Sequence, residues 1–163
     1  MAIFFSGSEL LDIALGIERN GLAFYQSLAN KTKNQEAKVI YNYLAGEEKK
    51  HLTTFQGIQN TIGQYQPPES YAGEYMLYLK ALVDSHVFSN TEGAQRKAEK
   101  VFGEIEALDI GMEAEKDSIL FYAEMQDIVR ESDRPIVSKI INEEKAHLRQ
   151  LSELKAALKK QRR

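Results

Sequence analysis

The chain alternates between long segments with apolar residues at helical spacing and short polar or proline-containing breaks. In the first segment, Ser6 and Glu9 have the spacing of a capping box, and apolar residues then recur every three or four positions. A second such segment follows a polar turn and ends near Gly63. The pattern predicts two long helices that form an antiparallel pair over about residues 8–63.

A third long helix is predicted in the second half of the chain. The polar residues 92–100 lead into apolar positions from Val101 to Met125, which we assign mainly to this helix. We expect it to end before Glu131.

The last apolar stripe predicts a fourth long helix. Ser132 or Asp133 can cap it, and Pro135 falls in its first turn, where proline is favoured. The third and fourth helices form a second pair over about residues 104–158.

A connector of about residues 64–103 separates the two pairs. It opens with Pro67 and Pro68, and the segment from Tyr71 to Phe88 predicts a shorter helix within it. Because such a connector is long enough to cross a bundle, the sequence predicts one all-α domain over residues 1–163. Its architecture is a four-helix bundle of two antiparallel hairpins with a long, partly helical crossover connector.

The two predicted hairpins repeat the same polar residues. Glu18 is followed seven residues later by Tyr25, and Glu115 is followed seven residues later by Tyr122. The second helix of each pair carries a Glu-x-x-His motif, and these motifs are Glu48 to His51 and Glu144 to His147. The chain is therefore interpreted as two copies of one helix hairpin.

Each of these glutamates stands where the helical period calls for an apolar residue. Glu47 and Glu143 also lie one turn before a His, but the stripes around them are less apolar, so we select Glu48 and Glu144. Four buried carboxylates without compensation would repel one another and take up protons. Two divalent metal ions would offset that charge, and four Glu with two His on four facing helices is the donor set of di-iron and di-manganese carboxylate proteins.

Other polar and aromatic residues are open to two interpretations. Tyr25 and Tyr122 are either core residues or phenols that hydrogen-bond a ligand or donate an electron near the site. His86 has no partner Glu at the right spacing and is interpreted as structural. The aromatic residues of the connector are interpreted as packing or a subunit contact, and they are Tyr71, Tyr75, Tyr78 and Phe88.

The amino-acid composition excludes several kinds of chemistry and partner. The 163 residues include no Cys, which excludes disulfides, Cys-ligated zinc, iron–sulfur clusters and a thiol nucleophile within this chain. A formal charge of −3 argues against nucleic acid as a partner. No run of about 18 apolar residues is present, and the first residues do not have the form of a signal peptide, so we expect no membrane association and a cytoplasmic location.

With these motifs the sequence resembles the ferritin-like di-iron superfamily, and within it the rubrerythrin-like proteins that lack a rubredoxin domain. The resemblance implies a ferritin-like bundle with two Fe ions, although Mn or mixed Mn/Fe loading suits the same donors. It also implies terminal carboxylates, bridging carboxylates and nitrogen ligands, which are Glu18 and Glu115, Glu48 and Glu144, and His51 and His147, respectively.

Two features depart from the rubrerythrin pattern. Rubrerythrins usually carry a further Glu one turn after the ligand on the third helix, where this chain has Ser118. The six-ligand set is thus more similar to that of bacterioferritin, but the connector between His51 and Glu115 is longer than in either family.

The resemblance implies an oxidoreductase that reduces hydrogen peroxide or dioxygen. Because this chain has no Cys, a separate electron-donor protein is expected as a partner, together with a homo-oligomer for which a dimer is favoured. The alternatives are a ferroxidase, iron-storage or iron-handling subunit and, from a different class, a metal-free helical interaction module.

Overall fold

The computed structural model describes residues 6–65 and 73–163, with side chains from Met76 onward in the second range. Every element within these ranges is helical, which confirms the predicted all-α class. In chain order the elements are α1 (Gly7–Lys31), α2 (Gln35–Ile62), α3 (Gly73–Asp84), α4 (Thr91–Lys100), α5 (Glu104–Ile128), the 3₁₀ turn η1 (Glu131–Asp133) and α6 (Arg134–Gln161).

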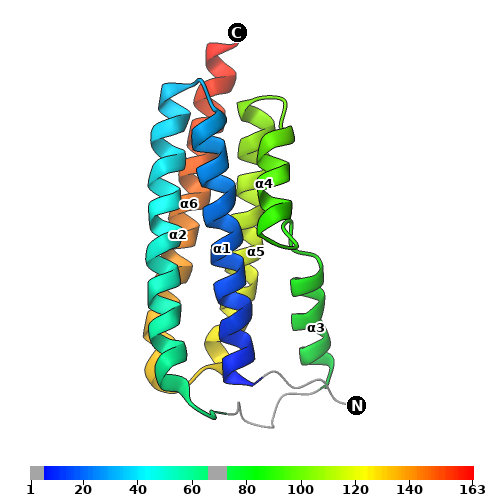
Figure 1. The fold of residues 1–163 in the computed structure, drawn as a ribbon, viewed down its shortest axis with the longest axis vertical. Coiled ribbons are helices and arrows are strands. Elements are labelled where there is room, and N and C mark those ends of the chain that lie inside the picture. The colour runs from blue at the N-terminus through cyan, green and yellow to red at the C-terminus, as the bar shows by residue number, and fades with distance from the viewer. Residues whose placement is uncertain (1–5, 66–72) are drawn as a thin grey trace.

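Four long helices form the bundle, and the two short ones lie along its side (Figure 1). The chain rises through α1, returns through α2, and crosses the length of the bundle by way of α3 and α4 before descending through α5 and rising through α6. The bundle is therefore built of the pairs α1/α2 and α5/α6, which pack closely within each pair. Among the described residues, no helix combines the length and apolarity needed to cross a bilayer.

Local signals explain where the helices begin and end. The predicted capping box is present, because the Ser6 hydroxyl accepts a hydrogen bond from the Glu9 N–H at 3.1 Å and the Glu9 carboxylate accepts one from the Ser6 N–H at 2.6 Å. Gly63 ends α2 with φ +56°, and Gly103 precedes α5 with φ +130°. Both glycines occupy backbone conformations that L residues with a side chain rarely adopt.

The third long helix is α5 and begins near residue 104 as predicted, but the polar residues 92–100 of the connector form a helix of their own, α4, that the sequence pattern did not predict. The Asn90 side chain caps α4 by accepting a hydrogen bond from the Gly93 N–H at 2.7 Å, and Val101 ends the helix. Two alanines four residues apart on α4, Ala94 and Ala98, are fully buried. This apolar stripe of two small residues is too short to indicate a separate helix from the sequence.

The predicted helix from Tyr71 to Phe88 also differs from the structure, since α3 ends at Asp84. Phe88 lies beyond it and packs in the core against Phe24, with ring centroids 4.7 Å apart. Of the other aromatic residues, Tyr78 is exposed, whereas Tyr71 and the side chain of Tyr75 lie outside the described residues.

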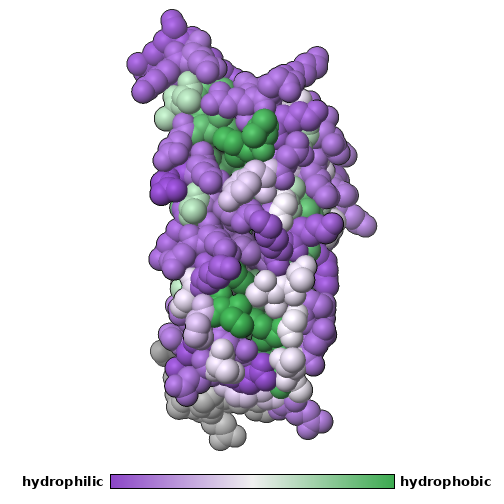
Figure 2. All heavy atoms as spheres, turned by 90° about the vertical axis from the view of Figure 1, so that its left-hand side faces the viewer, coloured by the Kyte–Doolittle hydropathy of each residue, from purple (hydrophilic) through white to green (hydrophobic). Residues whose placement is uncertain are grey.

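The apolar core is divided into two clusters by a polar layer. One cluster includes Leu11, Phe55 and Met125, and the other includes Leu28, Leu44 and Leu154. The face over α2 and α6 is mostly hydrophilic, with two separate hydrophobic areas (Figure 2). The polar layer between the two clusters is where the predicted ligands lie.

Candidate metal centre

The structure brings all six predicted ligand residues together inside the bundle. They form two overlapping groups in which the donor atoms lie within 4.8 Å of one another, and these groups are Glu18, Glu48, His51 and Glu144, and Glu48, Glu115, Glu144 and His147. Every member is buried, with at most 5% of its surface exposed. Glu48 and Glu144 belong to both groups, so they occupy the shared position between two candidate metal positions.

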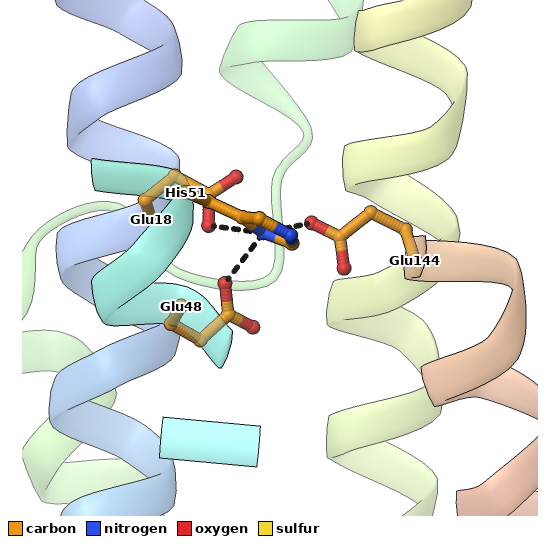
Figure 3. A group of neighbouring side chains, drawn as sticks. All are labelled: Glu18, Glu48, His51 and Glu144. Atoms are coloured by element: carbon orange, nitrogen blue, oxygen red, sulfur yellow. Dashed lines mark hydrogen bonds and ion pairs between the residues drawn. The ribbon is translucent and has the colours of Figure 1, made fainter. Parts of the chain in front are cut away.

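The first group surrounds the Nδ1 atom of His51 (Figure 3). This atom lies 3.3 Å from Glu18 Oε2, 3.8 Å from Glu48 Oε2 and 3.3 Å from Glu144 Oε1. The other ring nitrogen, Nε2, lies 3.0 Å from Oε2 of the partly exposed Glu143. Nδ1 is thus the nitrogen that faces the carboxylates, and Glu143 orients the ring from the outer side.

The second group repeats this arrangement around His147. Its Nδ1 atom lies 2.9 Å from Glu144 Oε2 and 3.8 Å from Glu115 Oε2. The two imidazoles, of His51 and His147, lie side by side with ring centroids 5.8 Å apart. The geometry also distinguishes Glu48 from its neighbour Glu47. Glu47 belongs to neither group, and its Oε1 atom pairs with Lys50 Nζ at 2.5 Å.

Tyr25 and Tyr122 connect the two hairpins at this layer. Tyr25 Oη donates a hydrogen bond to Glu115 Oε1 at 2.5 Å, and Tyr122 Oη donates one to Glu18 Oε1. Each phenol therefore holds one oxygen of a glutamate from the opposite hairpin and leaves Oε2 facing a histidine. Burial, followed by the charge of the partner glutamate, raises the pKa of both phenols well above the ordinary value, so they remain donors.

The charged forms of two of the glutamates are unfavourable in this cluster. Burial and the charges of neighbouring carboxylates raise the pKa of Glu48 and Glu144 well above the ordinary value. Burial also raises the pKa of Glu18, but hydrogen bonds with Glu48 and His51 outweigh it and lower the pKa overall. Positive charge close to these carboxylates would favour their ionised form.

The histidines respond in the opposite direction to their burial. Burial lowers the pKa of His51, but the close carboxylates of Glu144 and Glu18 outweigh it and raise the pKa far above its ordinary value. The pKa of His147 is raised in the same way, chiefly by Glu115 against the effect of burial. Protons on the histidines therefore take the place that cations would hold.

Two glycines that the sequence reasoning missed make room for these groups. A Cβ at Gly21 would lie 3.1 Å from both Cδ and Oε1 of Glu48, and a Cβ at Gly111 would lie 3.3 Å from Tyr25 Oη. Glycine inside a helix destabilises it by about 1 kcal/mol relative to alanine. Interior glycines in two of the predicted helices were therefore an available signal for close approach, here to Glu48 and to Tyr25.

The donor set fits two divalent cations. Carboxylate oxygens and imidazole nitrogens are ligands that Fe and Mn accept. Glu144 Oε1 is buried and lies 3.3 Å from His51 Nδ1 without the geometry of a hydrogen bond. A buried carboxylate oxygen without a donor is costly unless a cation or proton satisfies it.

Four antiparallel helices that each contribute a buried Glu, two of them as Glu-x-x-His, define the class of ferritin-like dinuclear carboxylate proteins. A sequence model of the rubrerythrin family matches residues 9–155, and the chain belongs to that family. Among solved structures, it is similar to a protein from Thermotoga maritima described as a candidate ferritin-like diiron-carboxylate protein. The two share 30% identity with a TM-score of 0.68, over 94% of this chain and 96% of the other. A comparison with curated protein sequences gives no significant match.

Proposed function

We propose that this protein is a non-haem di-iron oxidoreductase that reduces hydrogen peroxide or dioxygen. The observation that carries the proposal is the pair of four-donor groups that share Glu48 and Glu144. Membership of the rubrerythrin family supports it, as does the likeness to a protein described as a diiron-carboxylate protein.

In this proposal each residue has a defined task. Glu48 and Glu144 would hold both metal ions, Glu18 and His51 would complete one position, and Glu115 and His147 would complete the other. The two phenols keep one oxygen of each terminal carboxylate occupied, which would leave the remaining oxygen for the metal. Two bound ferrous ions would supply the two electrons that reduce a peroxide O–O bond.

The space beside the site supports a small oxidant as the substrate. A cavity reaches Glu48 and Glu115, and the volume in which the centre of a water molecule fits is about 10 Å³. This is the room that one water needs. An organic substrate would need rearrangement of the surrounding helices. Peroxide and dioxygen are the oxidants closest to that size.

Electrons must reach the site from outside this chain, because it contains no Cys to hold an iron–sulfur centre. We therefore propose a separate electron-donor protein as a partner, and a homo-oligomer, with a dimer favoured, as the working form.

The second candidate function is a ferroxidase or iron-handling subunit. Ser118 favours it, because this residue stands where rubrerythrins usually have a further Glu, and its hydroxyl donates to the Ala114 carbonyl at 3.1 Å. The site then has the six-ligand set that is similar to that of bacterioferritin.

Rapid mixing of the anaerobic di-ferrous protein distinguishes the two functions. If the protein is a peroxide reductase, the oxo-bridged ferric absorbance will rise much faster with hydrogen peroxide than with dioxygen. Equally slow rates would contradict peroxide reduction. The double variant Glu48→Ala/Glu144→Ala should bind no iron, whereas Glu47→Ala, which removes a neighbouring glutamate outside both groups, should bind iron normally.

A further inference from the structure

The small cavity beside the candidate metal centre has one wall that does not belong to the bundle. Helices α1 and α5 contribute Gly21 and Ser118, and Glu48 and Glu115 lie at the inner end. The remaining wall comes from the segment between α3 and α4, which contributes His86, Val87 and Phe88. The crossover connector thus places a histidine next to the proposed metal position.

The bundle leaves this opening at equivalent places in the two hairpins. Gly21 lies three residues after Glu18, and Ser118 lies three residues after Glu115. Both residues are small, and a Cβ at Gly21 would already lie 3.1 Å from the Glu48 carboxylate. A larger side chain at either position would fill the space that His86 covers.

Three contacts fix the segment that carries His86. The Val87 N–H donates to Asp117 Oδ2 on α5 at 2.8 Å. Phe88 is buried against Phe24 with ring centroids 4.7 Å apart. The His86 ring itself packs edge-on against Phe121, with centroids 6.5 Å apart and an interplanar angle of 81°. The imidazole is therefore held in place and is not a freely moving surface side chain.

The Nε2 atom of His86 is buried and has no hydrogen-bond partner among the described residues. Buried polar atoms in native structures almost always have a partner, from the protein or from a bound molecule. Burial lowers the pKa of the ring against the opposing effect of Asp117, so the ring is neutral at pH 7 and its Nε2 can donate or accept one hydrogen bond.

We propose that His86 Nε2 hydrogen-bonds the small oxygen ligand in this cavity, a water molecule at rest and hydrogen peroxide during the reaction, and so positions it beside Glu48 and Glu115. The identity of the ligand rests on the proposed function. The hydrogen bond itself rests on the cavity, the fixed ring and the unpartnered nitrogen. His86 thereby has a role beyond the structural one that its isolation in the sequence indicated.

Fluoride is a suitable probe, because it is as small as water and accepts hydrogen bonds. The di-ferric protein is titrated with fluoride, and the change in ferric absorbance gives the affinity. His86→Phe keeps the ring contact with Phe121 and removes the nitrogen, so we expect about tenfold weaker fluoride binding, in line with the loss of one hydrogen bond. His86→Gln, whose amide can donate, should recover most of the affinity.

Tyr43→Phe is the matched control. Tyr43 lies near His147, with ring centroids 6.2 Å apart, but does not line the cavity. The variant removes the hydroxyl of a ring that lies beside His147 and should bind fluoride as the unaltered protein does. In peroxide turnover, His86→Phe should raise KM more than it lowers kcat, whereas a purely structural role would lower the iron content instead.

Unchanged fluoride affinity in a His86→Phe protein that holds two iron ions would overturn the inference. If that variant does not fold, Ser118→Val provides a second test, because its larger side chain fills the same cavity from α5. Filling the cavity should weaken fluoride binding by a similar factor, and unchanged binding would overturn the inference. Failure of the proposed function is a separate result, in which peroxide does not oxidise the unaltered di-ferrous protein even though fluoride binding depends on His86.

Discussion

Glu144→Gln should stabilise the metal-free protein and destabilise the metal-loaded one. Glu144 is fully buried, its Oε1 lies 3.3 Å from His51 Nδ1 without hydrogen-bond geometry, and burial and neighbouring carboxylates raise its pKa. The amide has nearly the same shape and cannot ionise, so it removes the repulsion but also one ligand that both groups share.

The expected size follows from the cost of an unsatisfied buried polar group, about 1–3 kcal/mol. We expect the free energy of unfolding of the metal-free variant to rise by about 1 kcal/mol, because the His51 and His147 interactions with Glu144 are lost at the same time. With metal bound, the variant should be less stable than the unaltered protein. A ligand that binds only the folded protein stabilises it in proportion to the logarithm of its concentration over Kd, so weaker metal binding means less stabilisation.

Urea unfolding at pH 7, with and without two equivalents of Fe(II) under anaerobic conditions, measures both effects. Glu113→Gln is the control, because this exposed residue of the same helix as Glu115 should change stability by less than about 0.5 kcal/mol. If the metal-free Glu144→Gln protein is less stable than the unaltered one by about 1 kcal/mol or more, the Glu144 carboxylate stabilises the metal-free fold and the expected gain is wrong.

Three further predictions concern the same layer. Glu48 (ordinary pKa 4.5) and His51 (ordinary pKa 6.5) both have raised pKa values in the folded chain, so the folded state binds more protons than the unfolded state. The melting temperature of the metal-free protein should therefore fall as pH rises from about 5 to 8, and bound metal should remove most of that fall. Tyr122→Phe removes the hydrogen bond to Glu18 and should weaken metal binding about tenfold in a calorimetric titration. Gly21→Ala places a Cβ 3.1 Å from the Glu48 carboxylate and should lower the iron content measured by mass spectrometry, although alanine favours a helix.

Each of these three predictions would be contradicted by one specific result. A metal-free protein whose melting temperature rises across the same pH range would mean that Glu48 and His51 do not bind extra protons in the folded state. Full iron content in Gly21→Ala would show that Glu48 can move without loss of binding, and an unaffected Tyr122→Phe would show that its phenol is a core residue alone. Gly16→Ala, at an α1 position with open space around the new Cβ, is the control for the glycine change.

The long helices and the six clustered residues could be predicted from the sequence because both rest on local periodicity. Glu18 and Glu115 interrupt apolar stripes, and the repeat of Glu-x-x-His in the second hairpin indicates that the interruptions face one another. The polar layer in the structure follows from the same periodicity that places Leu11 and Leu28 in the core.

The connector could not be predicted as well, because its structure depends on contacts distant in sequence. Asp117 on α5 holds the Val87 backbone, and Lys31 on α1 donates to the Val101 carbonyl at the end of α4. His86 had no partner at helical spacing, so nothing in its neighbourhood placed it beside Glu48. Only the folded chain brings that residue to the cavity.

The six Glu and His residues are proposed to hold two metal ions, and an anaerobic Fe(II) titration monitored by calorimetry measures how many ions each chain binds. We expect two ions per chain, and none in the Glu48→Ala/Glu144→Ala variant, which lacks the two glutamates that both groups share. Binding of fewer than two ions by the unaltered protein, or the same two ions by the double variant, would contradict this proposal.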